Sequence, residues 1–166
     1  MSTENLMNPE ARKKMTEMVE DIKFAMMATN LGAKPMDVIP MTVKKVDDQG
    51  DIWFLSSRTS EHNKNISKDN EIQLVFSDPS EMEFISIYGK ATVTTDPQIL
   101  KEMYNSKTDI WFEGPDDPNL TAIKVRALDA YYWDSKSNKY VTLLKMGISA
   151  ATGKNMDIGE KGRLDV

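Results

Sequence analysis

Short runs rich in β-branched and aromatic residues, each ended by a turn signal, constrain the fold of this chain most strongly. Clusters of Gly, Pro, Asp, Asn and Ser separate the runs, as in the stretches 47–50 and 77–79. Short strands at this spacing, without regular alternation with helices, favour a barrel or sandwich over a parallel α/β sheet. The predicted strands lie at Phe24–Thr29, Val38–Val46, Ile52–Ser56, Ile72–Ser77, Phe84–Thr95, Ala122–Trp133 and Tyr140–Leu144.

Three helices are expected around this β-rich pattern. Pro9 and Pro97 each follow a residue that can act as a helix cap. Proline suits the first helical position, because its fixed φ is helical and its missing N–H would be unpaired there anyway. A serine before a polar, amphipathic stretch gives a third start signal. The predicted spans and their caps are 8–23 (Asn8), near 60–68 (Ser60) and 96–105 (Asp96).

The length of 166 residues suits one domain, because two independent cores would be cramped in so short a chain. We therefore expect a single, mainly β domain over residues 1–166, with a few peripheral helices. The barrel would occupy 24–146, and the Gly- and Lys-containing segment 147–166 would form a loose C-terminal tail.

Composition excludes several function classes. The net charge of −5 and the pI near 5.0 leave no basic surplus for phosphate backbones, so no nucleic-acid partner is expected. No stretch approaches the roughly 20 apolar residues of a membrane span, and the N-terminus lacks the apolar core of a signal peptide. We expect a cytoplasmic protein without a membrane partner. With no cysteine and one histidine, a disulfide is excluded and no metal site is expected.

The most informative stretch is 52–64, where an apolar strand enters a hydroxyl-rich, partly cationic loop that then begins a helix. Arg58, Ser60 and Lys64 would bring cations, a hydroxyl and free backbone N–H groups to one point. A phosphate monoester is bound by this set of donors. Alternatively, Ser60 only caps the helix and the two cations are solvated. The residues by themselves leave both interpretations open.

His62 raises a second interpretation, in which it acts as a general base on a nearby serine. Asp69 or Asp78 would then orient the imidazole, as in a hydrolytic triad. The G-x-S-x-G motif is missing, and a single histidine at a helix start is more often a capping or phosphate-contact residue. No Walker loop and no G-x-G-x-x-G motif occurs either, which disfavours a P-loop or Rossmann nucleotide site. We assign no catalytic residue.

The stretch 109–118 combines aromatic residues with turn residues and acids. Trp111 could form an aromatic wall over a planar ligand or at a subunit interface. Alternatively, Trp111 and Phe112 anchor a loop in the core. Asp116 and Asp117 could bind a hard cation, but no matching acidic cluster supports this.

Several weak motifs in order give the chain a family resemblance. Taken together, they resemble the general stress protein 26 group, which are small relatives of pyridoxamine 5'-phosphate oxidase with the flavin-binding split-barrel fold. The resemblance covers nearly the whole chain. The motifs are Pro40-Met41-Thr42, Ile52–Ser57, Ser60-x-His62, Gln73–Ser77, Tyr88–Ala91, Trp111–Pro118, Tyr132-Trp133-Asp134, Thr152-Gly153-Lys154 and Asp157–Glu160.

The resemblance implies a six-stranded split β-barrel and a homodimer that holds flavin mononucleotide (FMN) between its subunits. FAD, a deazaflavin and haem are more distant alternatives. Ser56 and Ser57 would lie along the ring system, and Ser60 and His62 would face the phosphate. The complete set of candidate cofactor-binding residues is Met41, Thr42, Val43, Ser56, Ser57, Arg58, Ser60, His62, Lys64, Trp111 and Lys124.

The sequence departs from the oxidase pattern at charged positions. An Arg-Lys pair is expected after Ser60, where Glu61 and His62 stand, and an arginine is expected near Ile39. Lys124 stands roughly where the oxidase has a substrate-binding arginine. Each lost charge-assisted bond is worth about 1.5–3 kcal/mol, so FMN affinity is expected to be modest and pyridoxal phosphate synthesis is disfavoured.

Two functions remain open at this point. The first is a flavin-dependent oxidoreductase of unknown small-molecule substrate, in which the cofactor carries the redox chemistry. The second is a stress-related flavin-binding module without turnover, with weak or lost cofactor binding.

Overall fold

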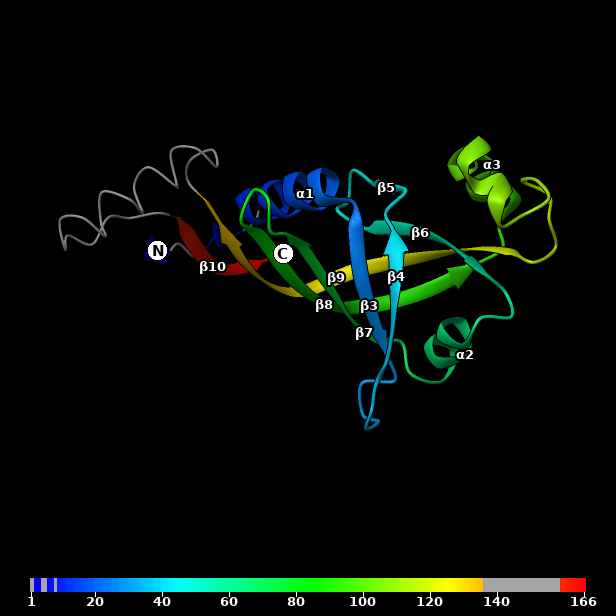
Figure 1. Cartoon of the computed structure of the whole chain (residues 1–166), viewed down its shortest axis with the longest axis horizontal. Helices are drawn as coiled ribbons and strands as arrows, with labels where there is room; N and C mark the ends of the chain where they lie inside the picture. Colours follow the sequence, from blue (N-terminus) through cyan, green and yellow to red (C-terminus); the bar gives the residue numbers. More distant parts are fainter. Residues whose placement is uncertain (1, 4–5, 8, 136–158) are drawn as a thin grey trace.

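A curled, largely antiparallel sheet forms most of the protein, with helices at its periphery (Figure 1). The computed structural model describes residues 2–3, 6–7, 9–135 and 159–166. In this described part the sheet has ten strands and there are three α-helices. The mainly β fold expected from the sequence is confirmed. No helix among the described residues is long and apolar enough to cross a membrane.

The elements follow one another in the order expected from the sequence pattern. The strands are β1 (Ser2–Thr3), β2 (Leu6–Met7), β3 (Phe24–Thr29), β4 (Asp37–Thr42), β5 (Lys45–Val46), β6 (Ile52–Ser57), β7 (Glu71–Asp78), β8 (Glu83–Thr94), β9 (Leu120–Asp134) and β10 (Glu160–Asp165). The helices are α1 (Glu10–Ile22), α2 (Glu61–Lys68), α3 (Pro97–Met103) and the 3₁₀ helix η1 (Ser106–Ile110). The predicted strand 140–144 lies outside the described residues.

The strand β9 holds the sheet together, because three other strands pair with it. The neighbour order is β1-β10-β9-β8-β7-β3-β4, while β6 pairs with β9 and β5 pairs with β6. On its N-terminal half β9 pairs with β6 along one edge and with β8 along the other. Along its C-terminal half, β9 pairs with β10 in place of β6. The sheet therefore curls around one apolar interior and leaves β4 at its edge.

The predicted strand 38–46 is in fact two strands with different partners. The strand β4 pairs with β3, whereas β5 pairs with β6 on the other side of the barrel. The pairing partner changes between Val43 and Lys44. The N–H of Val43 donates to the carbonyl of Lys23 beside β3, whereas the N–H of Lys44 donates to the carbonyl of Trp53 on β6. The sequence pattern did not reveal this corner, because the apolar run continues through it.

The main core lies between α1 and the inner face of the sheet. Its largest fully buried side chains include Met15, Phe54, Phe76 and Tyr132. A smaller cluster lies under α3 and is built from Trp53, Leu100, Met103, Leu120 and Ala122. The alternation along β6 divides the two clusters, with Ile52 and Phe54 in the main core and Trp53 in the smaller one.

Both ends of the chain depart from the sequence expectation. Pro9 occupies the N-cap position of α1 and forms no side-chain cap, whereas it was expected inside the helix; residue 8 lies outside the described part. The expected loose tail contains β10, which pairs with β9 and buries Leu164 completely. The sequence pattern does not predict this strand, because four of its six residues are charged and Leu164 is its one large apolar residue. One of the charged residues, Arg163, donates to the carboxylate of Asp129 at 2.6 Å.

Gly89 lies at a bulge in the pairing of β8 with β9. A Cβ atom there would lie 2.3 Å from the carbonyl oxygen of Arg126. We expect Gly89→Ala to lower the free energy of unfolding by about 2 kcal/mol or more, because backbone must move to relieve the clash. Gly32→Ala is the matched control, since nothing lies within 4 Å of that Cβ position. Equal urea midpoints for the two variants would contradict the β8–β9 register.

Candidate functional site

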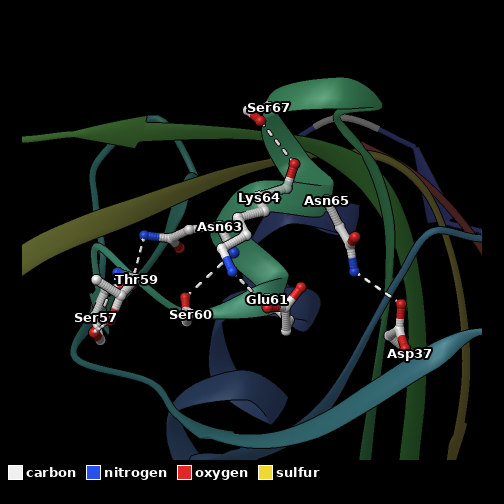
Figure 2. Close-up of polar contacts among 9 residues, drawn as sticks. All are labelled: Asp37, Ser57, Thr59, Ser60, Glu61, Asn63, Lys64, Asn65 and Ser67. Carbon is white, nitrogen blue, oxygen red and sulfur yellow. Dashed lines mark hydrogen bonds and ion pairs between the residues drawn. The ribbon is translucent and has the colours of Figure 1, made fainter.

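The end of β6 and the start of α2 form the candidate site (Figure 2). Ser60 caps α2: its backbone is extended, and its hydroxyl accepts a hydrogen bond from the N–H of Asn63 at 3.3 Å. Its carbonyl also accepts from the N–H of Lys64. The cap directs the helix N-terminus toward the loop that follows β6.

A buried hydrogen-bond network joins this helix to the sheet. The Ser56 hydroxyl lies 2.5 Å from Nε2 of His62, 3.0 Å from Oδ1 of Asn63 and 3.3 Å from the hydroxyl of Ser60. The amide nitrogen of Asn63 donates to Thr121 Oγ1 on β9 at 2.9 Å. Ser56, Asn63 and Thr121 are each less than a tenth exposed. Buried polar side chains in a satisfied network hold one geometry, so this network fixes α2 against β6.

A second set of contacts ties α2 to the β3–β4 hairpin. The amide nitrogen of Asn65 donates to Asp37 Oδ2 at 2.9 Å, as Figure 2 shows, and to Thr29 Oγ1 at 3.1 Å. The amide of Asn30 also donates to this carboxylate. Together with the Ser56 network, these contacts hold α2 between β6 and the β3–β4 hairpin.

The N-terminus of α2 offers donors suited to an anion. Within the described residues, the backbone N–H groups of Glu61 and His62 have no hydrogen-bond partner. Unpaired N–H groups and the helix dipole both favour negative charge at this position. Glu61 itself is neutralised by Lys64, whose Nζ lies 2.5 Å from its carboxylate. Burial lowers the pKa of His62, so its imidazole is neutral at neutral pH.

A groove of about 740 Å³ runs along the other side of α2. Arg58, Asn63 and Lys64 line it, together with Lys68 and β8 residues such as Thr92. Two of the expected cofactor-binding residues, Arg58 and Lys64, therefore line this groove, whereas Ser60 and His62 do not. Asn63 and Thr121 belong both to this lining and to the buried network, so the groove adjoins the network on the side away from Ser60 and His62.

Met41, Thr42 and Val43 lie at the edge of the sheet, the first two on β4 and Val43 directly after it. Met41 and Val43 are partly buried and pack against the main core, whereas Thr42 is exposed. Thr42 is paired with Phe24 in the β3–β4 ladder. Met41 and Val43 thus provide a partly apolar surface at this edge of the sheet.

The side chains of Ser57 and Lys124 do not join that of Ser56. The Ser57 hydroxyl contacts Thr59 Oγ1 at 3.1 Å and donates to Asn119 Oδ1 at 3.2 Å. Lys124 is paired with Trp53, three positions along β6 from Ser56. Residues an odd number of positions apart face opposite sides of a strand, so Lys124 and Ser56 face opposite sides.

Lys124 belongs to a separate charged cluster. Its Nζ lies 3.7 Å from the buried carboxylate of Asp51 and 5.8 Å from the centre of the Trp53 ring. The guanidinium of Arg126 holds the same carboxylate through two bonds of 3.2 Å. These contacts give Lys124 a structural role.

Trp111 is 72 % exposed, beside Ile110 at 76 %. The alternative that Trp111 and Phe112 anchor this loop in the core is correct for Phe112 alone, which packs against the cluster under α3. The loop is fixed by Tyr104, whose hydroxyl donates to Asp109 Oδ1 at 2.7 Å and lies 3.0 Å from the carbonyl oxygen of Phe112. Trp111 is therefore presented outward by an anchored loop.

The Ser56–His62 contact fits a hydrolytic triad, but among the described residues neither Asp69 nor Asp78 orients the imidazole. Asp69 accepts from the N–H of Glu71, and Asp78 accepts from that of Ser80, each within its own turn. In the described part of the chain no group of three or more His, Asp or Glu side chains is arranged to hold a metal ion.

The sequence interpretation missed Asn63, Asn65 and Thr121. A buried asparagine in a short helix is a weak signal, because asparagine is a poor helix former and needs partners when buried. Thr121 could not be identified without knowing that β9 pairs with β6.

Comparison with known proteins identifies the family. Residues 10–157 match the model of the family described as pyridoxamine 5'-phosphate oxidase like. The protein bli-3 of Neurospora crassa is 25% identical over 113 residues, which are 63% of this chain and 54% of that protein. General stress protein 26 of Bacillus subtilis is 30% identical over 46 residues, which are 28% of this chain and 33% of that protein. The chain thus spans about half or less of these relatives.

Solved structures support the same assignment. A general stress protein 26 from Jannaschia has a TM-score of 0.79 at 21% identity, covering 95% of this chain and 98% of that one. A general stress FMN/FAD-binding protein from Xanthomonas citri has a TM-score of 0.66 at 25% identity, covering 78% of this chain and 92% of that one. The split-barrel fold expected from the resemblance is confirmed. This chain belongs to the pyridoxamine 5'-phosphate oxidase-like family and is similar to its general stress proteins.

Proposed function

We propose that the chain binds FMN at the junction of β6 and α2 and acts, as a homodimer, as a flavin-dependent oxidoreductase. The observation that carries the proposal is the donor set at the start of α2. It combines the Ser60 hydroxyl with the backbone N–H groups of Glu61 and His62, which have no partner among the described residues. These donors fit a phosphate monoester, and they do not depend on the missing Arg-Lys pair.

The ring system would lie beside the end of β4. Met41 and Val43 present partly buried apolar side chains there, and a flat heterocycle can pack on such a surface. When bound, FMN would supply two-electron redox chemistry, while the residues of this chain bind and orient it. The Xanthomonas relative named as an FMN/FAD-binding protein supports a flavin. FMN is favoured over FAD here because the proposed donors suit a terminal phosphate.

The homodimer is supported by an exposed apolar face of the sheet. Met26 on β3 is paired with Pro40 on β4 and with Val75 on β7, so the three side chains form one row. Met26 is 45 % and Val75 is 44 % exposed, and Phe24 lies beside them at 65 %. Contiguous apolar surface of this kind is typical of protein interfaces. Continuity of this face with the β4 edge would bring a second subunit close to the flavin site.

The donor set predicts that Ser60→Ala combined with His62→Ala weakens FMN binding at least tenfold, or about 1.4 kcal/mol. Removal of a phosphate contact is the cause, so riboflavin affinity should change little. Titration with fluorescence quenching measures both ligands. Ser80→Ala, at an exposed turn distant in sequence, is the control. Unchanged FMN affinity in the double variant would contradict this phosphate site.

A turnover assay distinguishes a flavin-dependent oxidoreductase from a flavin-binding module without catalysis. The FMN-loaded protein should oxidise reduced nicotinamide nucleotides faster than free FMN does at equal concentration. Absorbance of the reduced nucleotide measures the rate. No acceleration with any electron donor tested would favour the non-catalytic module.

The exposed row predicts that Val75→Lys disrupts the dimer, because each copy would bury an unpaired ammonium group. We expect the dimer dissociation constant to rise at least tenfold, as measured by size-exclusion chromatography with light scattering. Gln49→Lys, at an exposed turn, adds the same charge elsewhere and should leave the dimer intact. A wild-type monomer at micromolar concentration would contradict the homodimer.

A further inference from the structure

The directions of the hydrogen bonds around Ser56 can be worked out from the groups that can only accept. The amide nitrogen of Asn63 lies 3.0 Å from the carbonyl oxygen of Ser57, which has no proton to give. It also lies 2.9 Å from Thr121 Oγ1, whose own proton goes to the carbonyl of Ser56. A flipped amide would place two acceptors against each other at the Ser57 contact. Oδ1 of Asn63 must therefore face Ser56.

This orientation fixes the proton of the Ser56 hydroxyl. Oδ1 of Asn63 is buried, and Ser56 lies 3.0 Å from it as a donor. A hydroxyl has one proton and two acceptor sites. If the proton goes to Asn63, the 2.5 Å contact with Nε2 of His62 requires a proton on that nitrogen. The second acceptor site of Ser56 needs no donor, so the Ser60 hydroxyl, at 3.3 Å, keeps its own proton for a phosphate. Every member of the network is then satisfied.

We propose that this network holds His62 in the Nε2–H tautomer, so that His62 binds an FMN phosphate only by taking up a proton at Nδ1. The inference rests on the proposed function and adds a regulation to it. With Nε2–H committed to Ser56, the neutral ring has only an acceptor left, and a phosphate dianion is also an acceptor. Protonation at Nδ1 creates the missing donor. Phosphate binding is therefore linked to proton uptake.

No other positive charge near His62 among the described residues can take the place of the proton at Nδ1. On α2, Glu61 is paired with Lys64, and on β4 the carboxylate of Asp37 is held by Asn65. Arg58 precedes the helix and lies in the groove on its other side. The parts of β3, β6, β8 and β9 that contact or line α2, including Thr29, Ser56, Ala91–Val93 and Thr121, carry no charged side chain. Burial lowers the pKa of the free imidazole, and a phosphate would raise it.

The tautomer can be tested in the protein without flavin, because His62 is the only histidine. A long-range ¹H–¹⁵N correlation spectrum of the imidazole distinguishes the two tautomers directly. We expect the Nε2–H pattern at about pH 8, where the ring is neutral. Asn63→Ala, which removes the acceptor for the Ser56 proton, should shift the population toward Nδ1–H. An Nδ1–H pattern in the wild type would overturn the proposal.

The proton linkage can be tested by FMN titration above about pH 7, where the phosphate itself is already a dianion. We expect wild-type affinity to fall by up to about tenfold per pH unit. His62→Gln keeps an N–H donor but cannot take up a proton, and His62→Lys is always charged. Both variants should show affinity nearly independent of pH, with the lysine variant tighter at about pH 8. A pH-independent wild type would overturn the proposal.

The same spectrum separates this inference from the proposed function. Bound FMN should raise the pKa of His62, whereas riboflavin should leave it nearly unchanged. If FMN leaves the imidazole signals unchanged at every pH and no titration detects binding, the proposed function fails and the linkage fails with it. If FMN binds but the tautomer or the pH dependence differs, only this inference fails.

Discussion

The structure depends on the pairing of β9 with three strands, because this pairing brings distant segments to one place. On one edge, β9 places Thr121 opposite Ser56 of β6, and the buried side chain of Asn63 then connects both strands to α2. On the other edge, β9 pairs with β8 through a bulge that requires Gly89. The position of α2, and with it the proposed phosphate site, follows from strand pairing that is fixed elsewhere in the barrel.

The site combines a buried neutral network with cations that lie at the surface. Lys64 is paired with Glu61, and Arg58 lines the groove beside α2, so neither is held in the network around Ser56. In water, a surface ion pair contributes little, whereas unpaired N–H groups at a helix start and one protonated imidazole act directly on an anion. A permanent lysine at the position of His62 would make binding insensitive to pH. On the proposed linkage, the histidine makes phosphate affinity conditional on pH.

Local patterns predicted the strands and the Ser60 cap well, because alternation and capping depend on residues close in sequence. The pattern over 38–46 predicts one strand, since nothing local reveals that β4 and β5 have different partners. The prediction of a loose C-terminal tail is wrong at 160–165 for the same reason: β10 is stable only against the edge of β9. The strand pairing also places Lys124 on the face opposite Ser56, and the motif comparison alone could not indicate this.

The central claim is that this chain holds a flavin through its phosphate at the start of α2. The most direct measurement is a fluorescence-quenching titration of the flavin-free wild-type protein with FMN and, in parallel, with riboflavin. The account predicts saturable FMN binding that is at least tenfold tighter than riboflavin binding, or about 1.4 kcal/mol. Equal affinities would contradict the phosphate site, and binding of neither flavin would contradict the proposed function.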